Sequence, residues 1–425
     1  MEKSFETVDW AHRTNIYEVN IRQYTTEGTL NAFAEHIPRL KDMGVDTLWF
    51  MPLQPIGQLN RKGTLGSYYS VSDYEALNPE YGSLDDFKAI VEKAHANGMK
   101  VLIDWVANHT SWDHVWTISD PDFFSKNESG GFRPPYPDWA DVIQLDYSNK
   151  DLWKSMIKAM KLWVNEFDID GFRCDMAHMV PLDFWKEART EIDEEKKLFW
   201  LAETEHANYH EAFDASYTWE FLHAMEAYWR KETGIYGLDT VLHKYEHSFP
   251  KNAMRLFFTS NHDENSHSGS EYVRLGLAAK VFAVFCCTWN GIPLIYSGQE
   301  LPSQVRLMFF ERDPIRWSED VELHDFYKTL LTLHHFHPAM RVNDPESQIF
   351  RVATKVGGRV FSFLRRNGVR EVLVFLNLSE DELSVNITDE RVNGKFREVF
   401  TNEITDFDNN RELELNFWEF KVFEK

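Results

Sequence analysis

Carboxylates and histidines recur in this chain directly after short apolar runs that read as buried β-strands. Acids are depleted within strands, so repeated acids at strand ends indicate one shared polar rim. Three carboxylates, an arginine and two histidines at one rim suit cleavage of a glycosidic bond, which needs one ionised and one protonated carboxyl group beside the scissile bond. The four stretches are DWVANH (104–109), GFRCD (171–175), LAE (201–203) and FFTSNHD (257–263).

Each of these residues taken alone has an ordinary structural explanation. An Asp after a strand commonly caps a helix or forms a turn, and a His beside an Asp is often a structural pair. The joint occurrence at four strand ends favours catalysis, because separate strands of a (β/α)8 barrel present their catalytic side chains at one face.

Strand and helix signals alternate through most of the chain, which predicts an α/β fold of the (β/α)8 TIM-barrel type. A helical pattern over Leu30–Met43 stops at Gly44 and is followed by the apolar strand Val45–Met51. A capping pattern at Ser83–Asp86 begins another helix, and the last predicted barrel strand is Ile292–Gly298.

Two segments depart from this alternation. Residues 110–147 are rich in Asp, Pro, Gly and aromatics and show no helical period, which is typical of a functional loop. Residues 341–425 contain short strand signals separated by turn residues, which predicts a C-terminal antiparallel β-sandwich. We therefore predict a catalytic barrel from residues 1–109 and 148–340, interrupted by a short insertion at 110–147.

Composition narrows the class of partner. The chain has 425 residues, 43% hydrophobic, which is enough for a large core. Its net charge of −23 argues against nucleic acid and anionic membrane surfaces, both of which need basic patches. No stretch reaches membrane-spanning length, and the N-terminus lacks the apolar segment of a signal peptide. We expect a cytoplasmic protein. A secreted or periplasmic protein whose leader has been removed would show the same sequence features.

The four stretches together resemble the four signature regions of the α-amylase family of glycoside hydrolases (glycoside hydrolase family thirteen), in the same order. The segments Ile16–Asn20 and Tyr69–Tyr74 are also similar to that family, and the likeness runs from about residue 15 to the last strand. The resemblance implies that the insertion at 110–147 is a short B domain after the third strand, and that residues 341–425 are the C domain.

The resemblance also implies catalytic roles at the matching positions. Asp175 matches the nucleophile, Glu203 the general acid/base, and Asp263 the third acid, which grips sugar hydroxyls and stabilises the oxocarbenium-like transition state. Arg173 is expected to hold Asp175 ionised through charge-assisted hydrogen bonds.

A further set of residues is expected to bind or frame the substrate. Tyr69 matches a tyrosine that stacks on the sugar ring, and His109 and His262 match histidines that bond the central sugar. Asp104 is expected to be a structural partner of the site and His206 to lie on the leaving-group side. The predicted substrate-binding set is Tyr69, His109, Arg173, His262, Asp104 and His206.

Calcium is where the chain departs from the family pattern. Asn108 occupies a position that binds calcium in many relatives, but Met179 replaces a histidine and Gln144 replaces an aspartate. Calcium prefers several oxygen ligands that include carboxylates. We therefore expect no required cofactor and no metal site, with Asn108 as the one candidate calcium ligand.

These observations predict a retaining enzyme that cleaves α-1,4-glucosidic bonds of starch-like α-glucans or malto-oligosaccharides through a covalent glycosyl-enzyme intermediate, and acts as a monomer. The alternative within the family is an α-glucosidase, transglycosylase or isomerase that acts on short α-glucosides. A third interpretation is a noncatalytic binding or scaffold relative. Such relatives typically lack an acid of the triad, whereas this chain has all three.

Overall fold

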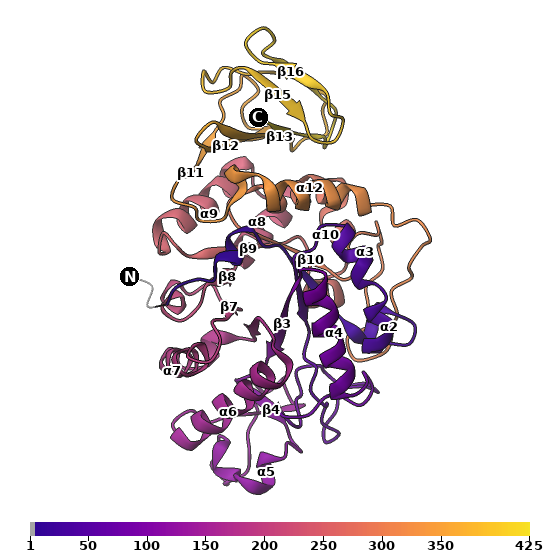
Figure 1. Cartoon of the computed structure of the whole chain (residues 1–425), viewed down its shortest axis with the longest axis vertical. Coiled ribbons are helices and arrows are strands. Elements are labelled where there is room, and N and C mark those ends of the chain that lie inside the picture. Colours follow the sequence, from indigo (N-terminus) through magenta and orange to yellow (C-terminus); the bar gives the residue numbers. More distant parts are fainter. Residues whose placement is uncertain (1–4) are drawn as a thin grey trace.

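The computed structural model describes residues 5–425, and its central feature is a closed barrel of parallel strands (Figure 1). The order around the ring is β1-β10-β9-β8-β7-β6-β3-β2. This arrangement confirms the predicted TIM barrel. The barrel strands are β1 (Ile16–Val19), β2 (Thr47–Phe50), β3 (Lys100–Trp105), β6 (Gly171–Cys174), β7 (Phe199–Ala202), β8 (Ala215–Tyr217), β9 (Met254–Phe257) and β10 (Ile292–Tyr296).

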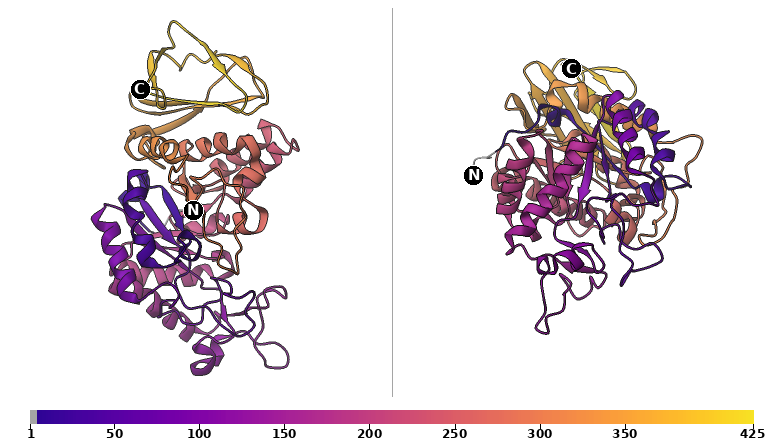
Figure 2. Two further views of the ribbon diagram at one scale, coloured as in Figure 1. Left: turned by 90° about the vertical axis from the view of Figure 1, so that its right-hand side faces the viewer. Right: turned by 60° about the horizontal axis from the view of Figure 1, so that its bottom comes forward.

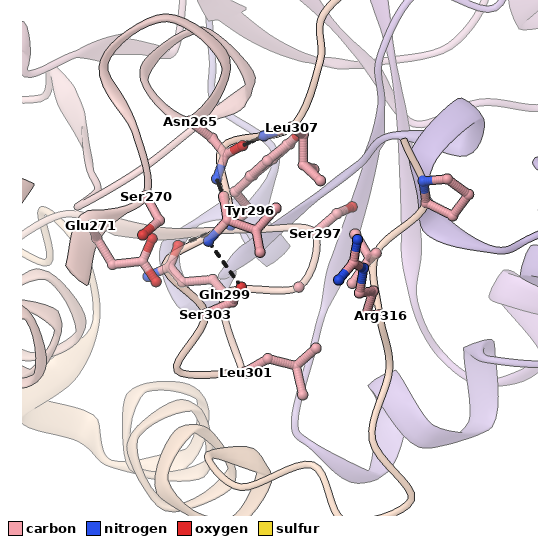
Figure 3. Close-up of a pocket in the computed structure, with 14 residues that line it drawn as sticks. Asn265, Ser270, Glu271, Tyr296, Ser297, Gln299, Leu301, Ser303, Leu307 and Arg316 are labelled. Carbon is pink, nitrogen blue, oxygen red and sulfur yellow. Dashed lines mark hydrogen bonds between the residues drawn. The ribbon is translucent and has the colours of Figure 1, made fainter. Parts of the chain in front are cut away.

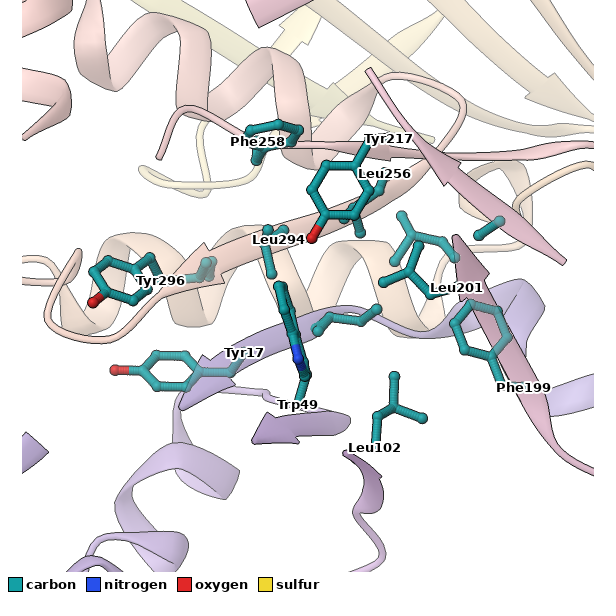
Figure 4. Close-up of a cluster of buried hydrophobic side chains, with 14 of the residues drawn as sticks. Tyr17, Trp49, Leu102, Phe199, Leu201, Tyr217, Leu256, Phe258, Leu294 and Tyr296 are labelled. Carbon is teal, nitrogen blue, oxygen red and sulfur yellow. The ribbon is translucent and has the colours of Figure 1, made fainter. Parts of the chain in front are cut away.

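The barrel strands are almost entirely buried, because side chains fill the inside and helices cover the outside. Figure 4 shows large apolar side chains from different strands meeting in one cluster, among them Trp49 of β2, Leu201 of β7 and Leu294 of β10. This packed core fixes the strand ends, so polar side chains that follow the strands are held in place at the rim.

Helices and short turns of helix surround the barrel. The α-helices are α1 (Ile21–Tyr24), α2 (Leu30–Ala34), α3 (Ile37–Asp42), α4 (Leu84–Ala96), α5 (Trp116–Ser119), α6 (Lys150–Phe167), α7 (Leu182–Asp193), α8 (Trp219–Trp229), α9 (Ile235–Ser248), α10 (Glu271–Leu275), α11 (Ala279–Thr288) and α12 (His324–Phe336). Single turns are η1 (Asp9–Arg13), η2 (Pro121–Phe123), η3 (Ala177–Met179), η4 (Ala207–Glu211), η6 (Gly276–Ala278) and η7 (Pro338–Met340), and η5 (Glu264–Ser268) is a π-helical turn.

Two predicted helices can be compared with the helices of the structure. At α4, Ser83 accepts a hydrogen bond from the Asp86 N–H and Asp86 accepts one from the Ser83 N–H, so the predicted capping box is present. The single helix predicted over Leu30–Met43 is instead divided into α2 and α3. Pro38 explains the division. A proline would break the interior of one continuous helix, but it is tolerated in the first turn, where Pro38 lies in α3.

The insertion after β3 is framed by two short strands that the sequence pattern did not predict. β4 (His109–Ser111) pairs antiparallel with β5 (Val142–Gln144), so that His109 lies opposite Gln144. The insertion projects from one end of the molecule (Figure 1). The pairing places His109 at its base, next to the ends of the barrel strands.

The C-terminal part is antiparallel, as predicted, and lies at the end of the molecule away from the insertion (Figures 1 and 2). A six-stranded sheet has the order β11-β12-β13-β18-β15-β16, and β14 pairs with β17 in a second sheet. Its strands are β11 (Ser347–Arg351), β12 (Val360–Asn367), β13 (Arg370–Asn377), β14 (Leu383–Asn386), β15 (Lys395–Glu398), β16 (Ile404–Asp406), β17 (Glu412–Leu415) and β18 (Phe420–Glu424).

Arg365 of β12 joins this part to the barrel. Its guanidinium is buried and donates to the carbonyl oxygens of Trp289 at 2.7 Å and Arg341 at 3.1 Å. Among residues 5–425, no helix combines the length and apolar character needed to cross a membrane.

Candidate active site

A cleft of about 350 Å³ opens at the C-terminal ends of the barrel strands. It brings together six of the residues that the sequence singled out, and they come from the ends of three barrel strands, from β4 and from the loop after β2. The predicted residues that line it are Tyr69, His109, Asp175, Glu203, His262 and Asp263. The other lining residues are Lys62, Ser67, Asp138, Trp139, Asp141, Val142, Met176, His267, Phe309 and Phe310.

Arg173 of β6 lies beneath the cleft and contacts three acids at once. Its Nη1 is 3.0 Å from Asp104 Oδ1 and 3.1 Å from Asp175 Oδ1, and its Nη2 is 2.8 Å from Glu203 Oε2. The guanidinium has no exposed surface. One buried cation among three carboxyl groups leaves a surplus of negative charge, which favours keeping a proton among these acids.

The two carboxyl oxygens of Asp175 differ in their hydrogen bonding. Oδ1 accepts from Arg173, whereas the buried Oδ2 has no hydrogen-bond partner among residues 5–425. Burial, followed by the charge of Glu203, raises the pKa of Asp175 well above its ordinary value, against the attraction of Arg173. Arg173 lowers the pKa of Asp175 while burial and the second carboxylate raise it. That Arg173 holds Asp175 ionised for the reaction stays a prediction.

The residue after Asp175 has an unusual backbone that orients Glu203. Met176 is left-handed, with φ 41° and ψ 45°, a region that non-glycine residues rarely adopt. In this conformation its N–H donates to Glu203 Oε2 at 2.9 Å. The Glu203 N–H donates to the Cys174 carbonyl at 3.0 Å. The carboxyl groups of Asp175 and Glu203 are thus held on neighbouring strands by the same stretch of chain.

His262 links Asp263 to a buried acid that the sequence analysis did not identify. Its Nε2 lies 3.2 Å from Asp263 Oδ2 and 2.8 Å from the Tyr69 hydroxyl, and its Nδ1 lies 2.5 Å from Glu18 Oε1. Burial opposes a charge on His262, but Asp263 and Glu18 outweigh it and raise the pKa of His262 well above its ordinary value. The partly exposed carboxyl of Asp263 in turn has its pKa lowered to about 2, because His262 outweighs burial.

Tyr69 and His109 form polar and aromatic surfaces on the cleft wall. The Tyr69 ring stacks on His262 with 5.2 Å between centroids, and its hydroxyl donates to Asp104 Oδ2 at 3.0 Å. Burial lowers the pKa of His109 to about 4, so this ring is neutral near pH 7. Because Asn108 Nδ2 donates to His109 Nδ1 at 3.2 Å, the ring proton lies on Nε2, which is then a donor.

Three predicted substrate contacts are not on the cleft surface. Asp104 and Arg173 have no exposed side-chain surface, so they hold Tyr69 and the acids in place and cannot touch a sugar. His206 is not among the lining residues, and its ring stacks on His178 with 5.3 Å between centroids. The sequence pattern shows that these residues are near a strand end but not whether a side chain points into the barrel or toward solvent.

The residues near Asn108 do not fit a calcium site. Asn108 itself is buried, and its side-chain oxygen carries no charge. Gln144 supplies no charge, and no group of three His, Cys, Asp or Glu side chains in residues 5–425 comes together in a way that could hold a metal ion. A hard cation needs several oxygen ligands with carboxylate charge, which this donor set lacks.

A second, smaller cavity of about 50 Å³ is lined mainly by residues of the segments that follow β9 and β10 (Figure 3). Asn265 and Tyr296 line it, and the Tyr296 N–H donates to Gln299 Oε1 at 3.1 Å. Glu271 also lines this cavity, and burial raises the pKa of its carboxyl to about 7. The Ser270 hydroxyl beside it is buried and lacks a hydrogen-bond partner among the described residues.

Comparison with known proteins agrees with this geometry. The family profile "Alpha amylase, catalytic domain" matches residues 3–140 and 136–330. The solved structure of an alpha-amylase from Lactobacillus plantarum is 30% identical, with a TM-score of 0.87, over 98% of this chain and 99% of that one. A noncanonic maltogenic alpha-amylase, AmyB, from Thermotoga neapolitana is 29% identical, with a TM-score of 0.89, over 98% and 99% of the two chains.

Among curated proteins, alpha-amylase MalA of Haloarcula japonica is 27% identical over 93% of this chain. The match spans 60% of the length of that relative. The family profile covers most of the chain, the barrel and its C-terminal sheets have the corresponding fold, and the acids of the signature regions meet in one cleft. The chain belongs to the α-amylase family and is a glycoside hydrolase of the amylase type.

Proposed function

We propose that the protein hydrolyses α-1,4-glucosidic bonds of starch-like α-glucans and malto-oligosaccharides with retention of anomeric configuration. The observation that carries this proposal is the placement of Asp175, Glu203 and Asp263 in one cleft, with Asp175 Oδ2 free of protein partners. A nucleophile needs an unengaged lone pair, and a retaining glycosidase needs a second carboxyl group close to the first.

The cleavage step follows from this arrangement. With the shared proton on Glu203 and Asp175 ionised, Asp175 Oδ2 attacks the anomeric carbon and forms a glycosyl ester, while Glu203 gives its proton to the departing glycosidic oxygen. A water molecule then attacks the ester, Glu203 removes the water's proton, and Asp175 leaves as a carboxylate. The Arg173 guanidinium, 3.1 Å from Asp175 Oδ1, stabilises that carboxylate in both steps.

The remaining lining residues would hold the sugar at the reacting carbon. Asp263 is ionised and can accept from two sugar hydroxyls as positive charge develops on the ring. The Tyr69 ring offers an apolar face, to which a sugar ring can stack. The neutral His109 can donate from Nε2 to a sugar oxygen.

The substrate class is supported by what related proteins are named for. Besides alpha-amylases, the relatives include a cyclomaltodextrinase from a Bacillus species that is 25% identical over 82% of this chain. A Rhodospirillum rubrum protein named alpha-1,4-glucan:maltose-1-phosphate maltosyltransferase is 30% identical over 40% of this chain. Transfer of the glycosyl group to a sugar hydroxyl is therefore the second candidate activity, since it passes through the same ester.

The test is product analysis with maltotetraose. We expect shorter maltosaccharides as the main products, and longer ones where transfer competes with hydrolysis. Asp175→Asn should abolish turnover while circular dichroism and melting temperature stay unchanged, because the amide keeps the shape but cannot form the ester. Asp183→Asn, at an exposed position in α7, is the matched control and should keep wild-type turnover. Wild-type rates in Asp175→Asn would overturn the assignment of the nucleophile.

A further inference from the structure

A loop between β2 and α4 supplies part of the cleft lining. We call residues 57–67 the bridging loop. Lys62 in this loop lines the cleft, and its Nζ lies 2.8 Å from Asp141 Oδ1 and donates to the Asp138 carbonyl at 2.9 Å. Both partners belong to the insertion after β3. The bridging loop is therefore tied across the cleft to the insertion.

The other side of the bridging loop is bound to the segment that follows β10. The Thr64 N–H donates to Glu311 Oε1 at 2.9 Å, and the Leu65 N–H donates to the Phe310 carbonyl at 3.1 Å. Gly63 has φ +63°, and a Cβ there would lie 2.5 Å from Phe310 Cβ, so the two segments touch too closely for any side chain. The three loops form one continuous wall.

Bonds within and beneath the bridging loop fix its shape. Arg61 donates to the carbonyl oxygens of Gly57 at 2.8 Å and Ile56 at 2.9 Å. The buried Arg22, which follows β1, donates to the Gly66 carbonyl at 2.9 Å. Charge-assisted bonds from two arginines make this wall a permanent part of the cleft.

The wall stands opposite Glu203. Glu203 follows β7. In the ring of eight strands β7 is four strands from β1 in either direction, so β1 and β7 face each other across the mouth of the barrel. The bridging loop contacts Arg22 just after β1 and Phe310 in the segment after β10, which is the neighbour of β1. The cleft therefore runs from the wall to the acid.

The direction of the bound glucan follows from this placement, and the inference rests on the proposed function. Glu203 protonates the glycosidic oxygen, so the departing, reducing-end part of the chain lies on the Glu203 side. The sugar that Asp175 attacks, and every sugar on its nonreducing side, must lie toward the wall. A long glucan cannot continue in that direction, because the bridging loop, the insertion and the segment after β10 are joined there.

We propose that the enzyme acts from chain ends: it takes linear α-glucans with a free nonreducing end and releases a short product from that end. The Lys62–Asp141 pair is the specificity-determining contact, because it closes the wall between the bridging loop and the insertion. Lys62 and Asp141 both line the cleft, so this end presents polar groups that can bond the terminal sugar's hydroxyls.

The experiment compares two forms of maltoheptaose that carry a chromophore at the reducing end. One has a free nonreducing end, and in the other that end is capped by an ethylidene acetal. We expect the wild-type enzyme to cleave the capped form at least about tenfold more slowly, a barrier increase of about 1.4 kcal/mol. With the free form, early chromatograms should show the chromophore on one long fragment.

Two variants locate the cause. Lys62→Ala should open the wall and raise the capped-to-free rate ratio severalfold. Lys126→Ala is the matched control, because Lys126 forms an exposed 2.6 Å ion pair with Asp122 in the same insertion and does not line the cleft, so it should keep the wild-type ratio.

The possible results separate this inference from the proposed function. Equal rates on the capped and free forms, with the chromophore spread over many fragments, would overturn cleavage from chain ends and leave the proposed hydrolysis standing. A wild-type ratio in Lys62→Ala would overturn the role given to the Lys62–Asp141 pair. Failure to cleave either form would overturn both the proposed function and the inference built on it.

Discussion

Glu18 Oε1 and His262 Nδ1 lie 2.5 Å apart in the buried floor of the cleft, and the other carboxylate oxygen of Glu18 has no hydrogen-bond partner among residues 5–425. The opposite ring nitrogen of His262 faces the Tyr69 oxygen at 2.8 Å, and the Tyr69 hydroxyl proton is donated to Asp104. Both ring nitrogens therefore face acceptors, which is the pattern of an imidazolium. Glu18 positions His262 and keeps it charged next to Asp263.

Glu18→Gln tests this relationship. Removal of the Glu18 charge should lower the pKa of His262, because an opposite charge in contact favours the protonated ring. His262 with a raised pKa stays protonated until the pH passes that pKa, so lowering the pKa makes the ring lose its proton at a lower pH. The basic limb of the kcat/KM profile should move to lower pH, with less change at acidic pH.

Glu92→Gln, on the exposed face of α4, is the control and should leave the profile unchanged. If Glu18→Gln kept the wild-type basic limb, His262 would not depend on Glu18 for its charge.

Glu271, in the second, smaller cavity, should make stability depend on pH. Burial raises the pKa of its carboxyl to about 7 from 4.5, so between these values the folded state binds more protons than the unfolded state. The free energy of unfolding should therefore fall as pH rises from 4.5 to 7, by on the order of 3 kcal/mol. The Glu271→Gln variant has no carboxyl group to titrate, so its free energy of unfolding should not fall in this way. The melting temperature of the variant minus that of wild type should therefore be larger at pH 8 than at pH 5.

The same Glu92→Gln variant serves as the control for Glu271→Gln and should follow wild type at both pH values. A melting-temperature difference between Glu271→Gln and wild type that is the same at pH 5 and pH 8 would show that Glu271 titrates normally.

Chelation tests the expectation about calcium. Asn108 and Gln144 carry no charge, so we expect an excess of chelator to leave both activity and melting temperature unchanged. A metal that bound only the folded state would stabilise it by roughly 2.7 kcal/mol at a hundredfold excess over its Kd. A drop of several degrees on chelation that calcium alone restores would contradict the expectation.

Much of the fold could be predicted because the signals for it are local. The barrel strands are apolar runs, and the capping box at Ser83 and Asp86 marks a helix start from four residues alone. The strands β4 and β5 could not be predicted, because each has three residues and their pairing depends on residues more than thirty positions apart.

The catalytic acids were predictable because each is a polar residue that ends an apolar run, as at Asp175, Glu203 and Asp263. Lys62 and Asp141 meet through the fold of two long loops, and nothing in either segment signals the contact. Glu18 did carry a signal, because an acid inside a buried strand is rare. Exposure was the other unpredictable quantity: Asp104 and Arg173 are fully buried, although they stand in the same stretches as residues that line the cleft.

The anomeric form of the first product tests the central claim most directly. Asp175 and Glu203 follow the adjacent strands β6 and β7, and a retaining pair holds its carboxyl groups about 5–5.5 Å apart, which leaves no room for a water between Asp175 and the sugar. Proton NMR of maltotetraose hydrolysis, recorded before the products mutarotate, should show the α-anomer first. Initial appearance of the β-anomer would mean direct attack by water and would contradict the assignment of Asp175 as nucleophile.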